Sequence, residues 1–178
     1  MMKNIGYYML LAILFASCSA VKVNYDYEKT TDFSGYTTYN YYPDLNTGLG
    51  ELDTKRLLKA VDAAMQAKGI LLAEEPDFFI NIQSSSFRAP RSNSSVGVGV
   101  GGGGRNVGGG VSIGIPVGQP SFSREIVFDF VDSQRDALFW QGVTESSYRD
   151  NASPNTREQL LNQIVTKVFS KYPPAIKK

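Results

Sequence analysis

The start of the chain limits how much of it can enter a folded domain. An apolar run over residues 5–17 follows the basic residue Lys3 and ends at the only cysteine of the chain, Cys18. A basic start, a short apolar run and small residues before a cleavage point are typical of a secretory signal. The run is shorter than the ~20 apolar residues that a membrane-spanning helix needs. We therefore expect residues 1–17 to be a cleaved signal peptide, and the fold to be built from the residues after it.

The residues around the cysteine predict a lipid anchor. Ala16 and Ser17 stand directly before Cys18, a pattern that resembles the lipid-attachment signal of bacterial lipoproteins, although Phe15 replaces the usual aliphatic residue. In that signal the thiol receives diacylglycerol and the new amino terminus an acyl chain such as palmitate, and three chains anchor a protein stably. Ser19 resembles the signal for the outer membrane of a Gram-negative bacterium. We expect lipidation at Cys18 and a domain that faces the periplasm; a plain secretory signal with an incidental cysteine is the alternative.

Composition excludes several classes of function. The 18 basic and 17 acidic residues nearly cancel, so no overall field attracts nucleic acid. The chain has no histidine, which is the commonest general base and metal ligand. Ser–His–Asp and Cys–His catalysis are therefore excluded. With the single cysteine lipidated, zinc, haem and iron–sulfur sites lack their usual ligands, and we expect no cofactor and no metal.

Hydrophobic periodicity predicts an α+β fold. Strands are expected over residues 21–27, 37–42, 78–83 continuing towards 87, 125–131 and 137–143 continuing to 148, and helices over residues 53–68 and from 153 or 155 to 172. With the glycine-rich segment this predicts a mainly antiparallel or mixed sheet of about six to eight strands, with two helices packed on one face. We expect a lipidated terminus and short tether at residues 18–20, one domain over residues 21–174, and a tail at residues 175–178.

Capping residues set the expected helix ends. Asp53 or Thr54 is expected to cap the first helix, and Gly69 to stop it. Ser153 or Asn155 is expected to cap the second helix, which has a proline near its first turn.

A long hairpin carries the candidate site residues. Its two strands join through a turn that Asp132 initiates, and one face of the second strand is expected to hold Leu138, Trp140 and Gly142. Gly142 would leave room beside Trp140. The candidate ligand or interaction surface consists of Asp129, Asp132, Trp140 and Gly142. Trp140 and its aromatic neighbours are expected either to line a pocket or, more simply, to form core.

Two metal or cofactor patterns are weak. Asp129, Asp132 and Asp136 are spaced like calcium ligands, but they do not match a calcium-loop pattern, and a turn explains them more simply. Residues 97–102 fit G-x-G-x-x-G, yet no helix can start in the glycines that follow, as a dinucleotide site requires. Pairs of acidic residues could be chosen as the two catalytic carboxylates of a glycoside hydrolase, but the sequence does not give the distance between them in space.

Residues 92–119 form a glycine-rich insert. Valine and isoleucine alternate with small residues on both sides of residues 101–110, which predicts a flexible hairpin. Pro116 suggests an edge position for its arm. The hairpin is either an interaction arm for an envelope protein partner or a variable insert between two core strands.

Five short segments occur in order along the chain: Tyr25-Asp26, Asp32 to Tyr39, Pro76 to Ile80, Val131-Asp132 with Leu138 to Gly142, and Phe169 to Pro174. Their order and spacing resemble a bacterial lipoprotein family called domain of unknown function 4136. The resemblance covers nearly all of residues 21–174. It implies a lipid-anchored α+β envelope domain and carries over no catalytic residue, because the family has no established activity.

Together these observations predict a membrane-anchored, non-enzymatic protein with a structural or partner-binding role. The alternative is a small-ligand or glycan binder, or a carboxylate-based hydrolase, that uses an aromatic and acidic cleft.

Overall fold

The computed structural model describes residues 21–88 and 122–175. The predicted signal peptide, Cys18 and the glycine-rich hairpin lie outside the described residues.

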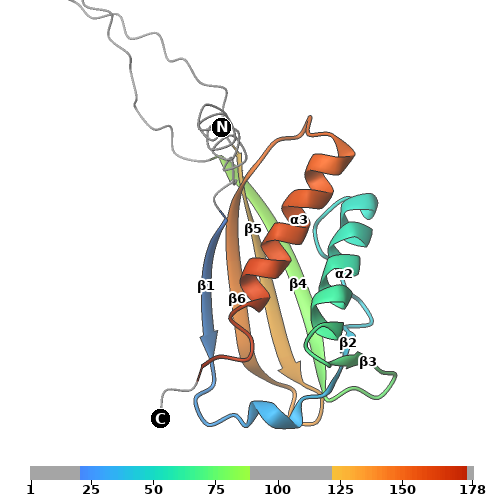
Figure 1. Ribbon diagram of the computed structural model, residues 1–178, viewed down its shortest axis with the longest axis vertical. Helices are drawn as coiled ribbons and strands as arrows, with labels where there is room; N and C mark the ends of the chain where they lie inside the picture. Colours follow the sequence, from blue (N-terminus) through green and yellow to red (C-terminus); the bar gives the residue numbers. More distant parts are fainter. Residues whose placement is uncertain (1–20, 89–121, 176–178) are drawn as a thin grey trace, which may run out of the picture.

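One six-stranded mixed sheet forms the framework (Figure 1). Its strands, in the order β1-β6-β5-β4-β2-β3, are β1 Lys22–Tyr27, β6 Ala137–Tyr148, β5 Phe122–Asp132, β4 Phe78–Arg88, β2 Thr38–Tyr41 and β3 Leu71–Leu72. Adjacent strands among the first four are antiparallel to each other, whereas β2 runs parallel to β4 and to β3. A short 3-10 helix, η2 Phe33–Gly35, precedes β2.

Two helices, α2 Glu51–Gln66 and α3 Pro154–Phe169, cover one face of the sheet (Figure 1). The predicted α+β fold, with two helices on one sheet face, is therefore confirmed. Among the described residues, no helix has both the length and the apolar character needed to cross a membrane.

The core lies between this sheet face and the helices. Alternate residues of the strands point to it, as the period of two along a strand requires. The largest fully buried side chains are Trp140, Tyr39, Phe78, Phe128, Phe130, Phe169, Leu57, Met65, Ile80, Ile82, Ile126 and Ile164.

The helix ends differ in part from the predicted ones. Ser153 caps α3 as expected, because its side chain accepts a hydrogen bond from the backbone N–H of Thr156. Gly50, rather than Asp53 or Thr54, is the N-cap of α2. Asp53 lies inside the first turn, where its carboxylate pairs with arginines instead of the helix backbone. Gly69 has φ +77°, which supports its predicted role after the helix end.

A bulge in the β5–β6 hairpin corrects the predicted face of β6. Phe130 pairs with Trp140 but Val131 pairs with Leu138, so Phe139 is the extra residue. Leu138 consequently does not share the buried face with Trp140 and is 52% exposed. Phe139 and Trp140 are both buried.

Three chain positions meet at the end of the sheet that is uppermost in Figure 1. Phe122 pairs with Arg88 on one side and with Tyr148 on the other. Lys22 pairs with Glu145, so Val21 is the residue before β1 on the side of this end. We refer to this end of the sheet as the upper end. The opposite, lower end holds η2 and the β5–β6 turn.

Candidate functional site

The four candidate residues of the hairpin do not form one site. Asp129 lies on the sheet face away from the helices, where its carboxylate accepts a 2.7 Å hydrogen bond from the Gln141 side chain on the neighbouring strand. Asp132 lies in the turn at the lower end. Trp140 and Gly142 lie in the core.

Trp140 and Gly142 have packing roles. The Trp140 ring packs on Phe130 and Tyr172, with ring centroids 4.7 and 5.3 Å apart. A Cβ at position 142 would collide with Val168 and would lie 2.6 Å from Cη2 of Trp140. The predicted room beside Trp140 is thus filled by the tryptophan itself and by α3, and the interpretation of these aromatic residues as core is confirmed.

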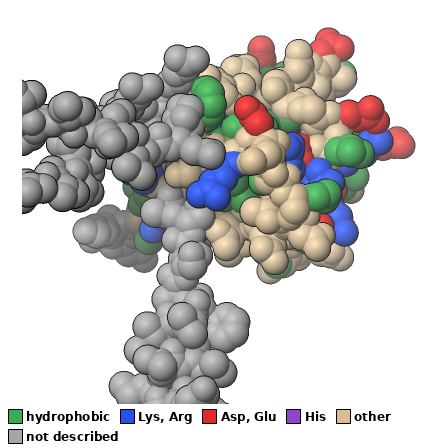
Figure 2. Space-filling view, turned by 90° about the horizontal axis from the view of Figure 1, so that it is seen from above, with side chains coloured by type: hydrophobic (Ala, Val, Ile, Leu, Met, Phe, Trp, Pro, Cys, Tyr) green, Lys and Arg blue, Asp and Glu red, His purple; other side chains and the backbone are tan. Residues whose placement is uncertain are grey.

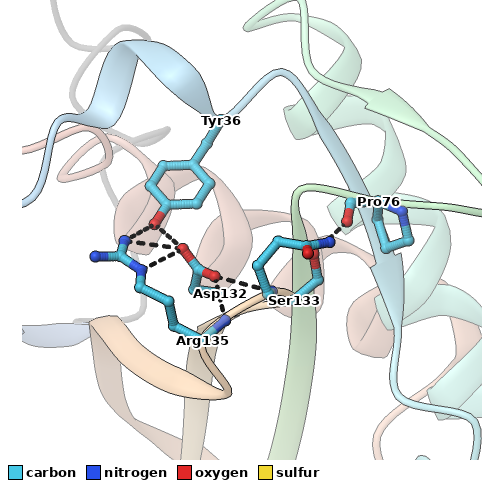
Figure 3. Close-up of polar contacts among 6 residues, drawn as sticks. Tyr36, Pro76, Asp132, Ser133 and Arg135 are labelled. Atoms are coloured by element: carbon cyan, nitrogen blue, oxygen red, sulfur yellow. Dashed lines mark hydrogen bonds and ion pairs between the residues drawn. The ribbon is translucent and has the colours of Figure 1, made fainter.

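Asp132 is the centre of a hydrogen-bond network at the lower end (Figure 3). Its Oδ2 accepts hydrogen bonds from the Tyr36 hydroxyl at 2.7 Å and from Nη2 and Nε of Arg135 at 2.8 and 3.0 Å. Its Oδ1 accepts the backbone N–H groups of Gln134 and Arg135. The turn prediction is therefore confirmed, with Tyr36 from a distant segment as an additional partner.

These contacts fix the charge of Asp132. Burial raises the pKa of its carboxyl group, but the hydrogen bonds from Arg135 and Tyr36 outweigh burial and hold the pKa well below its ordinary value. Burial and the hydrogen bond to Asp132 raise the pKa of Tyr36. Asp132 therefore remains an ionised acceptor, which suits a structural tie better than acid–base chemistry.

An acidic depression of the surface lies beside this network. It is lined by Asp32, Gly35, Tyr36, Glu74, Glu75, Pro76, Asp77, Phe79, Asp132, Ser133, Gln134 and Arg135. Asp77 accepts 2.8 Å hydrogen bonds from the backbone N–H groups of Thr37 and Thr38, and Ser133 donates to the Pro76 carbonyl (Figure 3). Within residues 21–88 and 122–175, no group of acidic side chains is placed to hold a metal ion.

A second hollow in the described surface is a groove at the upper end that the sequence did not predict. It has a volume of about 490 Å³ and lies between the first half of α3 and the ends of β5 and β6. It is lined by Asp53, Arg124, Ser146, Ser147, Tyr148, Arg149, Ala152, Thr156, Arg157, Gln159, Leu160, Leu161, Gln163 and Ile164. We refer to it as the upper groove.

Asp53 joins the beginnings of the two helices at one side of the upper groove. Its carboxylate accepts hydrogen bonds from Arg56 at 2.6 Å and from Arg157 at 2.9 Å. Arg157 also donates to the backbone carbonyls of Ala152, at 3.0 Å, and of Asp150. The hydrogen bond to Asp53 raises the pKa of the Arg157 guanidinium above its ordinary value, so this cation is permanent.

The strand side of the upper groove carries a second arginine and a buried hydroxyl. The Arg124 guanidinium lies 3.4 Å from the centroid of the Tyr148 ring, and its Nε donates to the Ser86 hydroxyl at 3.3 Å. Ser146 is 3% exposed, and its hydroxyl has no hydrogen-bond partner among the described residues. The residues that line the upper groove come from α2, β5, the end of β6 with the loop after it, and α3. No single sequence motif therefore predicts the groove.

Solved structures of other proteins share this fold. A PDZ domain protein from Parabacteroides distasonis has 10% identity and a TM-score of 0.55, and the match covers 98% of this chain and 41% of that one. This chain thus spans less than half the length of that protein. A PelC variant from Paraburkholderia phytofirmans, described as a dodecamer, has 9% identity and a TM-score of 0.50, with 85% and 95% of the two chains covered. Identities this low show the fold alone.

Sequence comparison assigns the family. No curated protein matches the chain. The model of the family described as "Domain of unknown function (DUF4136)" matches residues 23–174, which is most of the chain and nearly all of its folded part. The chain therefore belongs to the DUF4136 family.

Proposed function

We propose that this protein is a lipid-anchored, non-enzymatic protein of the cell envelope that binds a partner close to the membrane. In this proposal residues 1–17 are removed, residues 18–20 form a short tether, and Cys18 holds the domain on the periplasmic side of the outer membrane. The glycine-rich hairpin makes the contact with the partner.

The observation that carries the proposal is the position of three chain segments at the upper end. Val21 precedes β1 there, only three residues after Cys18. The chain also leaves β4 at Arg88 and returns to β5 at Phe122 there, and these two residues pair directly. An anchor at Cys18 would therefore hold the membrane, the flanks of the glycine-rich hairpin and the upper groove on the same side of the domain.

The acidic groups of the fold favour a non-enzymatic role over hydrolysis. Four carboxyl groups, those of Glu28, Asp32, Asp77 and Asp132, have pKa values below their ordinary values. Hydrogen bonds from neighbouring side chains and backbone N–H groups cause the net shift in each case. A carboxylic acid that donates a proton in hydrolysis needs the opposite shift.

The partner contact can be tested by crosslinking in intact cells, followed by affinity purification of the protein. A variant that lacks residues 96–118 should lose the crosslinked partner while staying in the membrane fraction. The same partner yield with and without these residues would contradict the proposed role of the hairpin. Because crosslinked species are identified by mass, self-association of the chain would be recognised as a separate result.

A further inference from the structure

The upper groove has the charge and the lining of a binding site for an amphiphile. Two of its three arginines, Arg124 and Arg149, have no acidic partner among the described residues, whereas Arg157 is engaged by Asp53. The apolar part of the lining next to these cations is the half-buried side chain of Leu160, above the buried side chains of Leu161 and Ile164. Figure 2 looks down on this end of the molecule, and basic side chains lie near the middle of the view.

The buried hydroxyl of Ser146 is an independent sign of a ligand. Buried hydroxyl groups in proteins are nearly always hydrogen-bonded, because a hydroxyl that loses water on burial and gains no other partner destabilises the fold. Ser146 lines the upper groove, is 3% exposed and finds no partner among the described residues. A polar ligand atom in the groove would satisfy it.

The volume also fits a small ligand. Sites for small molecules usually have roughly 300–1,000 Å³ and combine apolar walls with a few convergent polar groups. The upper groove has about 490 Å³. Its α3 side combines three apolar residues, Leu160, Leu161 and Ile164, with polar ones such as Gln159 and Gln163, and the β5 and β6 side carries Arg124 and leads to Arg149. Its lining thus matches a molecule with an apolar tail and a negatively charged head.

We propose that the upper groove binds one single-chain amphiphile with an anionic oxygen headgroup, such as a fatty carboxylate or an alkyl phosphate. The headgroup lies between Arg124 and Arg149 and accepts the Ser146 hydroxyl hydrogen bond, and the tail lies along Leu160 and Ile164. Arg157 is a positioning residue, since its bonds to Asp53 and to the loop before α3 shape the groove wall. The inference rests on the proposed anchoring only for the source of the amphiphile, which would be the membrane; binding itself does not depend on the anchor.

Native mass spectrometry of the mature protein, purified in a neutral detergent, tests binding. The probes are dodecyl phosphate and dodecanoate, with dodecanol as the neutral molecule of equal tail length and inorganic phosphate as the headgroup alone. We expect a saturable one-to-one adduct with each anionic amphiphile, and none with dodecanol or inorganic phosphate at the same concentration. Equal binding of dodecanol would show a merely apolar surface and would overturn the proposal, as would the absence of any adduct with the folded protein.

Variants locate the site. The double variant Arg124→Gln, Arg149→Gln should weaken binding of dodecyl phosphate by about tenfold or more, because charge-assisted hydrogen bonds are lost. Arg124→Lys should retain most of the affinity. The control Lys29→Gln removes an exposed charge outside the upper groove and should leave binding unchanged. Unchanged binding in the double variant, with near-ultraviolet circular dichroism showing a native fold, would overturn the assignment of the headgroup site.

Discussion

The Tyr36 hydroxyl donates a 2.7 Å hydrogen bond to the Asp132 carboxylate, which lies 96 positions away in the sequence. The same tyrosine ring stacks on Phe139, with ring centroids 4.1 Å apart and planes inclined by 3°. Tyr36 therefore closes the lower end of the core, and its polar tip locks the turn of the β5–β6 hairpin. A buried residue with an apolar body and a satisfied hydroxyl can perform both tasks.

Replacement of Asp132 by asparagine should destabilise the fold by about 2 kcal/mol, because charge-assisted hydrogen bonds to a nearly buried carboxylate are weakened. The free energy of unfolding, measured with urea at about pH 7, checks this value. Asp136→Asn is a suitable control, because Asp136 is exposed in the same turn. Equal stability of Asp132→Asn and the control would contradict the proposed structural role of Asp132.

The contribution of Asp132 should also depend on pH. Because its pKa is lower in the folded protein than in the unfolded chain, its ionised form stabilises the fold above the unfolded value of ~3.9. This stabilisation is lost as the pH falls below that value. The difference in unfolding free energy between the natural protein and Asp132→Asn should therefore shrink between about pH 6 and about pH 3. A constant difference over this range would argue against the lowered pKa.

Gly142→Ala should destabilise the protein by roughly 1–3 kcal/mol, since the added methyl group forces the Trp140 ring or Val168 to move in a packed core. Thermal unfolding followed by circular dichroism provides the measurement. Gly35→Ala is the matched control, because a Cβ there meets no atom within 4 Å. If the two variants have the same melting temperature, the close packing around Gly142 does not limit stability.

The ion pairs of Asp53 with Arg56 and Arg157, which connect α2 to α3, should stabilise the fold more than an exposed ion pair does. Asp53→Asn weakens a nearly buried carboxylate that binds two arginines, and we expect a loss of roughly 1–3 kcal/mol. Glu51→Gln removes only the exposed pair with Lys55 and should cost less than about 0.5 kcal/mol. Chemical unfolding of both variants compares the two effects, and similar small losses would show that Asp53 adds little to helix packing.

Much of the fold follows from local patterns, and the exceptions have physical causes. The β5–β6 hairpin and α3 were predictable because apolar residues recur at strand and helix spacing over long segments. The bulge at Phe139 was not predictable, since one extra residue in a strand changes the faces without changing composition. The two-residue strand β3 has no alternation to detect, and backbone bonds such as Leu71 N–H to the Thr37 carbonyl define it.

The candidate surfaces were harder to predict than the fold. Trp140 and Gly142 stand out in the sequence, yet one core contact explains both. The upper groove brings together residues as distant as Asp53, Arg124 and Arg157. Their proximity depends on how α2 and α3 pack together, which no short motif encodes.

A lipid anchor at Cys18 can be measured by growing cells with labelled palmitate, purifying the protein and counting the label that it carries. We expect label in the natural protein and in Ser19→Ala, which keeps the thiol, and none in Cys18→Ser. In cell fractionation, the unlabelled Cys18→Ser protein should move from the membrane to the soluble fraction. Label that persists in Cys18→Ser, or a natural protein without label, would contradict the anchor.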